Sequence, residues 1–196
     1  MISQSNWGGK MLLGGLLMAI PFVHFFALGY LYRLLEDSRR GAPLALPDWD
    51  DWRKLFMDGL VFFLFLLFFA VVPVLLMWLV SRLPLLNLFG PLSYVPMIPA
   101  VLLGAPLTAA GLYCYQARQS FKDACDFRRI VDLVRTDAEA MFVPTLALLG
   151  FLLAGAPVLP LTFFVGAVPL FWFYFVLFHQ RETRRPPRLS GLYTSL

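Results

Sequence analysis

Three aspartates beside an apolar stretch are the residues of this chain best suited to chemistry. Asp48, Asp50 and Asp51 lie in the segment Pro47–Gly59, which continues without a break into the apolar residues 60–80. Carboxylates at this spacing can bind a divalent cation and, through it, the pyrophosphate of a lipid. They can equally cap a helix, since carboxylates accept hydrogen bonds from the free N–H groups of a first turn and face the positive end of its dipole.

The capping role is favoured because a metal site would need further carboxylates. Asp123 and Asp126, the aspartates of a second polar stretch, are interleaved with basic residues. Pro47, just ahead of the first cluster, also suits the entrance of a helix. We therefore predict no metal site, no cofactor and no catalytic residue here, and we expect this segment to seat the chain at a membrane interface.

The acidic and aromatic motif occurs a second time. Residues 51–56, Asp-Trp-Arg-Lys-Leu-Phe, align with residues 126–131, Asp-Phe-Arg-Arg-Ile-Val. In both segments apolar side chains recur at i, i+3, i+4 and i+7, and charged side chains occupy the opposite face. This pattern predicts two cytoplasmic amphipathic helices that lie in the interface. The residues expected to face lipid there are Asp48, Trp49, Asp50, Asp51, Trp52, Arg53, Lys54, Asp126, Phe127, Arg128 and Arg129.

A row of small side chains follows one face of a later apolar stretch. It consists of Ala100, Gly104, Thr108 and Gly111. Small residues at this spacing allow the backbone of a second helix to approach closely. Two interpretations stay open: a contact with another subunit, or packing against a helix of the same chain.

The elements that carry these residues are apolar enough to cross a membrane. The chain has 60% hydrophobic and 14% charged residues, with a mean hydropathy of +0.74, whereas soluble domains have about 25% charged residues. A spanning helix needs roughly 20 apolar residues. The stretches that qualify are Met11–Tyr32, Leu60–Val80, Pro96–Tyr115 and Met141–Phe178, of which the last is divided in two near Pro157. We predict an all-α polytopic membrane protein, one domain over residues 1–196, with about five transmembrane helices.

Basic residues give the threading, because Lys and Arg are retained on the cytoplasmic side of a membrane. Of the 16 Lys and Arg residues, all except Lys10 and Arg82 follow the first, third or fifth predicted span. This distribution places loops 33–58 and 118–139 and the C-terminus in the cytoplasm, and the N-terminus outside.

An alternative for the first stretch changes this topology. Pro21 interrupts the run, so Met11–Ile20 can enter the membrane from the cytoplasm and Val23–Leu35 can return. A re-entrant hairpin of this kind leaves four crossings and both termini inside.

The C-terminal residues 179–196 form a basic tail beside the last span. Each basic residue near an anionic leaflet adds about 1 kcal/mol of attraction. We expect the tail to bind anionic headgroups or a protein partner through Arg181, Arg184, Arg185 and Arg188. Because the basic residues are dispersed among loops, the pI of about 9.3 indicates lipid contacts and no nucleic-acid partner.

The order of these features predicts an internal repeat of span, interfacial helix and span. Repeat unit one covers about residues 11–80 and unit two about 96–156, followed by a last span at about 161–178. The ends of the preceding spans also match, since Gly29-Tyr30-Leu31-Tyr32 resembles Gly111-Leu112-Tyr113-Cys114-Tyr115. Repeats of this kind occur in membrane transporters.

Several segments resemble a prokaryotic family of polytopic membrane proteins, catalogued as domain of unknown function 4013. The resemblance is carried by residues 10–21, 28–30, 46–52, 56–60 and 127–131, and it covers nearly the whole chain. It implies a multi-pass protein of a prokaryotic cytoplasmic or intracytoplasmic membrane and supplies no catalytic residue.

Three functions are consistent with these observations. The first is a non-catalytic accessory or scaffolding subunit that binds membrane lipids and either a protein partner or further copies of itself. The second is a small transporter or channel built on the repeat. The third, a lipid-modifying enzyme, is disfavoured because no motif for nucleophilic, metal-dependent or phosphoryl-transfer catalysis occurs.

Overall fold

The chain is helical throughout the part that the computed structural model describes, residues 7–41, 46–84, 90–119 and 126–184. This confirms the all-α class. The helices are α1 (Trp7–Met18), α2 (His24–Arg39), α3 (Trp52–Leu66), the π-helical turn η1 (Leu67–Val71), α4 (Val72–Ser81), the 3-10 turn η2 (Gly90–Tyr94), α6 (Met97–Arg118), α8 (Phe127–Thr136), α9 (Ala138–Ala154), the 3-10 turn η3 (Ala156–Val158) and α10 (Leu159–Arg184).

Apolar helices of spanning length indicate a membrane protein. Within the described residues three stretches are long and apolar enough to cross a bilayer, namely Trp52–Ser81, Gly90–Ala117 and Ala156–Thr183. A fourth candidate is the pair α8 and α9, which is bent by 84°. The predicted count of five transmembrane helices is therefore not confirmed.

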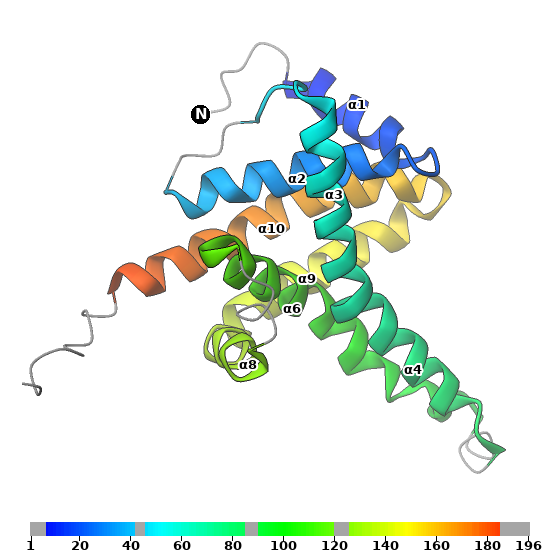
Figure 1. The fold of residues 1–196 in the computed structure, drawn as a ribbon. Helices are drawn as coiled ribbons and strands as arrows, with labels where there is room; N and C mark the ends of the chain where they lie inside the picture. The colour runs from blue at the N-terminus through cyan, green and yellow to red at the C-terminus, as the bar shows by residue number, and fades with distance from the viewer. Residues whose placement is uncertain (1–6, 42–45, 85–89, 120–125, 185–196) are drawn as a thin grey trace, which may run out of the picture.

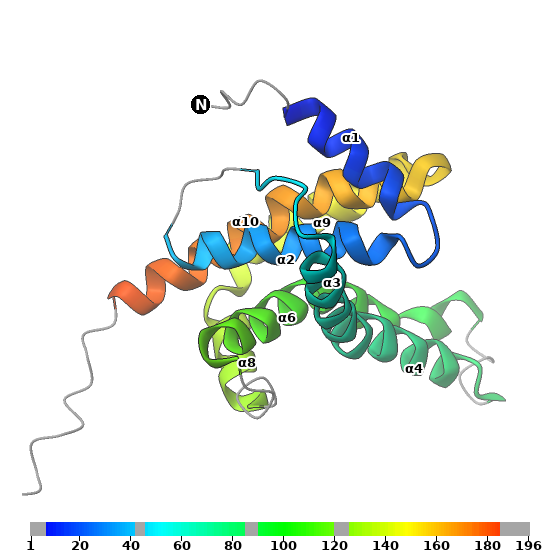
Figure 2. The same cartoon turned by 45° about the horizontal axis from the view of Figure 1, so that its top comes forward.

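The first apolar stretch folds as a hairpin of two helices. The prediction of a single span over Met11–Tyr32 is wrong, because α1 ends at Met18 and α2 begins at His24. Pro21 cannot supply an N–H to a continuing helix, and Phe22 takes a positive φ of 66° that turns the chain back. The alternative with a break at Pro21 matches these boundaries. Figures 1 and 2 show α1 doubling back along α2.

Helix α1 lies on α10, and two glycines allow the close contact. A Cβ on Gly14 would lie 2.1 Å from the Phe164 ring, and one on Gly15 would lie 2.0 Å from Leu161. Helices α2 and α10 lie side by side and run in the same direction (Figures 1 and 2). Helix α10 thus packs against both arms of the hairpin.

Helices α2 and α3 cross with their backbones in contact. A Cβ on Gly29 would lie 1.8 Å from the carbonyl oxygen of Leu55, and one on Gly59 would lie 1.7 Å from that of Phe25. Only glycine fits at such a crossing. Gly29 and Gly59 therefore fix where the second apolar stretch meets the hairpin.

Residues 52–81 form one continuous helical stretch of 30 residues. The predicted interfacial helix of the first motif copy is not confirmed as a separate element, because the helix continues through Gly59 without a break and the buried Leu55 and Gly59 pack on α2. The π-helical turn η1 lies two residues ahead of Pro73, whose missing N–H and bulky ring disturb the preceding turn of an α-helix. Helix α4 and the start of α6 project together from the rest of the molecule (Figure 1).

The small residues of α6 face this long helical stretch of the same chain. A Cβ on Gly104 would lie 3.0 Å from the Cβ of Ala70, and one on Gly111 would lie 2.8 Å from the Phe69 ring. Thr108 is fully buried and donates a hydrogen bond of 2.7 Å to the Gly104 carbonyl. Ala100 is half-buried on the same helix. Of the two interpretations of this row, the structure shows the intramolecular one.

Candidate interfacial site

Both copies of the acidic motif begin a helix with the same cap. The Asp51 carboxylate accepts a hydrogen bond from the backbone N–H of Lys54, and the Asp126 carboxylate accepts one from that of Arg129, each at 3.3 Å. An aspartate at this position satisfies an otherwise free donor of the first turn. The predicted capping is confirmed for Asp51, and the aligned Asp126 does the same for α8.

Asp48 and Asp50 do not cap a helix, so that prediction is wrong for them. Asp48 forms an ion pair of 2.7 Å with Lys10 of α1, and Asp50 pairs with Arg33 of α2. Lys10 also donates to the Leu46 carbonyl at 3.1 Å. The two carboxylates thus tie residues 46–51 to both arms of the α1 and α2 hairpin.

The ion pairs of residues 46–51 affect the protonation of Asp48. The hydrogen bond from Lys10, reinforced by its charge, lowers the pKa of the Asp48 carboxyl below its ordinary value. Asp48 is 84% exposed, so water screens much of this interaction. No group of three or more metal-ligating side chains occurs within the described residues.

Aromatic side chains cover the same segment. The Trp49 ring stacks on Tyr30 with ring centroids 4.3 Å apart and on Trp52 with centroids 6.2 Å apart. The Tyr30 hydroxyl donates to the Pro47 carbonyl at 3.0 Å. Trp52 remains 48% exposed and packs edge-to-face on Phe26. Of the side chains predicted to face lipid in this first copy, Trp52, Arg53 and Lys54 are exposed, whereas Trp49 is half-buried.

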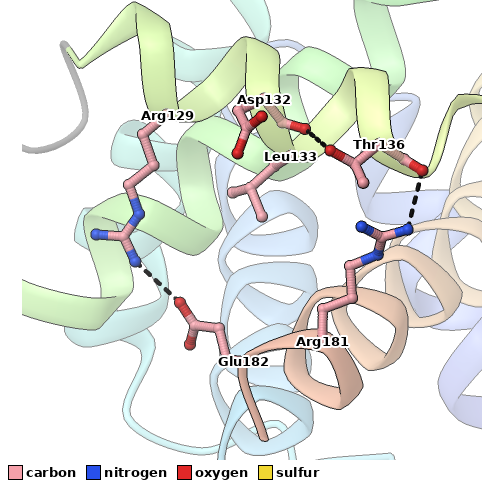
Figure 3. A pocket seen from close by; sticks show the side chains of 6 residues that line it. All are labelled: Arg129, Asp132, Leu133, Thr136, Arg181 and Glu182. Atoms are coloured by element: carbon pink, nitrogen blue, oxygen red, sulfur yellow. Dashed lines mark hydrogen bonds and ion pairs between the residues drawn. The ribbon is translucent and has the colours of Figure 1, made fainter. Parts of the chain in front are cut away.

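The second copy meets the C-terminal part of α10 (Figure 3). Arg129 of α8 forms an ion pair of 2.9 Å with Glu182, which also accepts a hydrogen bond of 2.8 Å from the Tyr113 hydroxyl of α6. Arg181 forms an ion pair of 2.5 Å with Asp137 and donates to the Thr136 carbonyl at 2.9 Å. Three helices are thus joined at one polar cluster.

This cluster differs from the sequence prediction. Arg129 and Arg181 were expected to contact lipid or a partner, but both are engaged in ion pairs inside the chain. Their partners Asp137 and Glu182 were not singled out, because residues 44 or more positions apart give no local spacing signal. A small cavity of about 60 Å³ lies among these side chains.

The other basic residues of the tail lie at or beyond the end of the described chain. Arg185 and Arg188 lie outside the described residues, and the structure describes the backbone of Arg184 but not its side chain. The predicted partner surface of the tail stays a prediction for these three residues.

Two larger cavities lie among the helices and are apolar. One of about 610 Å³ lies between α9 and α10, with Pro144, Leu148, Gly166 and Phe173 among its lining residues. Another of about 320 Å³ lies between the α4 and α6 pair and the α9 and α10 pair. Apolar cavities of this kind can take up hydrocarbon, and their walls offer no charged group for a hydrophilic solute.

A protein-family model matches most of the chain. The family model described as "Protein of unknown function (DUF4013)" matches residues 12–171. The chain belongs to the DUF4013 family. The DUF4013 match includes both copies of the motif and ends within α10, ahead of Arg181 and Glu182. Neither the curated proteins nor the solved structures include a match to the chain.

Proposed function

We propose that this protein is a non-catalytic accessory or scaffolding subunit that binds lipid and a larger membrane assembly. The observation that carries the proposal is the apolar character of its large cavities and exposed helix faces. Leu79 of α4 is 61% exposed, and Val143 and Leu153 of α9 are 68% and 80% exposed. Such surfaces require hydrocarbon or another helix as a neighbour.

The polar side chains support the same proposal. Those of the acidic segment and of the α8 and α10 cluster hold helices together, as in the pairs formed by Lys10, Arg33, Arg129 and Arg181. Charged groups committed to internal pairs serve the architecture of the protein. This use of charge fits a binding subunit better than an enzyme.

Purification of the full chain in mild detergent tests the proposal. We expect a tagged chain to copurify with lipids and with one or more membrane proteins at constant stoichiometry, whereas an untagged chain in the same membranes should recover none. A monodisperse, partner-free protein would contradict the subunit function.

A small transporter or channel is a second candidate, favoured by two interruptions of the helices. The α1 and α2 hairpin and the π-helical turn η1 resemble the broken helices on which transporters build their sites. Purified protein in liposomes would then carry a solute flux, which the subunit function does not require. Flux that appears with the intact protein and is absent with detergent-inactivated protein would establish this alternative.

For the topology, we infer four crossings, with both termini in the cytoplasm of a prokaryotic cell. The basic residues support this threading, and the hairpin of α1 and α2 fits a segment that enters and leaves on one side. A cysteine introduced at Ser5 should be protected from an impermeant reagent added outside intact cells. Labelling of that cysteine from outside would restore the five-span topology.

A further inference from the structure

The short helix α8 lies nearly perpendicular to the helix that follows it. The axes of α8 and α9 are bent by 84° at Asp137. Helix α9 has 17 mostly apolar residues, which at 1.5 Å per residue make about 25 Å of helix, the lower end of the length range of spanning helices. If α9 runs along the membrane normal, α8 lies in the plane of the membrane surface.

The faces of α8 differ in burial and polarity. Ile130 and Val134 are buried against the protein, whereas Phe127 and Val131, on an adjacent strip of the helix, are 52% and 48% exposed. The Phe127 ring contacts that of Phe68 with centroids 6.1 Å apart, and Phe68 is itself 56% exposed on a candidate span. The exposed apolar strip of α8 therefore continues the apolar surface of that span.

Two arginines border this strip on the side away from the core. Arg128 and Arg135 are exposed and lie two helical turns apart, so they project from one face of α8. Within the described residues neither takes part in an ion pair, in contrast to Arg129 and Arg181. The pairs formed by those two arginines fix the rotation of α8 and hold Arg128 and Arg135 outward.

We propose that α8 is the anionic-lipid-binding surface of this protein. Phe127 and Val131 lie at the acyl boundary of the cytoplasmic leaflet, and Arg128 and Arg135 bind the phosphates of anionic phospholipids above them. An apolar strip bordered by basic residues is the pattern by which helices seat in an anionic interface. This inference rests on the membrane placement proposed above and names one ligand class and its site.

Lipid selectivity gives the first test. The full chain is purified from vesicles of mixed anionic and zwitterionic phospholipid, and bound lipids are counted by native mass spectrometry. The double variant R128Q/R135Q should lose about five-fold of the anionic enrichment for each arginine removed, whereas R128K/R135K should keep most of it. The variant R40Q, which removes an exposed charge paired with Glu36, serves as the charge control. Equal enrichment in R128Q/R135Q and wild type would overturn the proposal.

Depth measurement gives a second test that does not depend on lipid retention. Single cysteines at Val131 and Thr136, on opposite sides of α8, are labelled with a fluorophore in a chain carrying Cys114→Ala and Cys125→Ser. Lipids spin-labelled near the headgroup should quench position 131 several-fold more than 136, and an aqueous quencher should show the reverse order. Equal aqueous quenching at both positions would place α8 off the bilayer. The copurification of partners is a separate measurement, so either result leaves the subunit function to its own test.

Discussion

At the scale of single residues, the crossing of α2 and α3 depends on Gly59. Because a Cβ there would lie 1.7 Å from a backbone oxygen, the two helices must move apart to accept any side chain. We expect Gly59→Ala to lower the free energy of unfolding by about 3 kcal/mol. Thermal unfolding of the detergent-solubilised chain measures this loss.

Gly150 provides a matched control for that substitution. A Cβ at this position of α9 would meet no atom within 4 Å. Gly150→Ala should leave stability unchanged or raise it by up to about 1 kcal/mol through helix propensity. Equal effects of the two substitutions would mean that the close crossing does not exist in solution.

The aspartate caps predict a second residue-level effect. Asp51→Ala and Asp126→Ala should each cost about 1 kcal/mol, since each leaves a first-turn N–H without its acceptor. Asp51→Asn should retain most of the stability, because asparagine caps as well and tolerates the positive φ of 49° at this position. Thermal stability in detergent checks both; an equal loss for Ala and Asn would show that charge, and not the cap, matters.

The pair of Asp48 with Lys10 predicts a dependence on pH. Because the folded-state pKa of Asp48 is lowered, its stabilising contribution is complete above the ordinary aspartate pKa of about 3.9. The contribution is lost as the pH falls from there through the lower folded-state pKa. Asp48→Asn should therefore be slightly less stable than wild type near neutral pH and equal to it in acid. A difference that grows on acidification would contradict the pair, and high salt should reduce the effect.

At the scale of elements, the junction of α8, α9 and α10 depends on Arg181 and Asp137. Asp137 is 7% exposed, so removal of Arg181 leaves a buried carboxylate without its counter-charge. In a double-mutant cycle, Arg181→Gln and Asp137→Asn should show a coupling of about 2 kcal/mol. Thermal unfolding of the two single variants and the double variant gives this coupling, and additive effects would mean that the two side chains do not interact.

Some contacts between the elements follow from local sequence signals, and others do not. Local signals sufficed where cause and effect lie within a few residues: the cap of Asp51 follows from an acidic residue ahead of an apolar period, and Pro21 marked the break between α1 and α2. The contact of Arg129 with Glu182 depends on how three helices pack, which no spacing encodes. The packing of Leu55 and Gly59 on α2 was not predicted, because an amphipathic pattern is the same whether its apolar face contacts lipid or another helix.

At the scale of the whole molecule, class and packing were predictable to different degrees. The length and composition of the apolar stretches were enough to predict a helical membrane protein. The small size of the α6 residues that face Ala70 and Phe69 was enough to predict a close helix contact. The position of α10 between the hairpin and α9 was not predictable. Glycines such as Gly14 and Gly166 allow a close helix contact, but their sequence position does not specify which helix makes it. A fold built on close glycine contacts should tolerate few enlargements along those faces.

The π-helical turn at Leu67–Val71 determines which face of the following helix, α4, points toward the rest of the protein. A π turn holds one residue more than an α turn between its hydrogen-bonded groups, and each residue of an α-helix corresponds to a rotation of about 100°. The extra residue shifts the faces of α4 relative to those of α3, and with this phase α4 packs on α6, as η1 and part of α3 also do. Deleting a single residue from this turn would keep the composition, the hydrophobic length and the charges almost unchanged. It would nevertheless rotate α4 away from α6, so this helix is more sensitive to insertions and deletions than to substitutions.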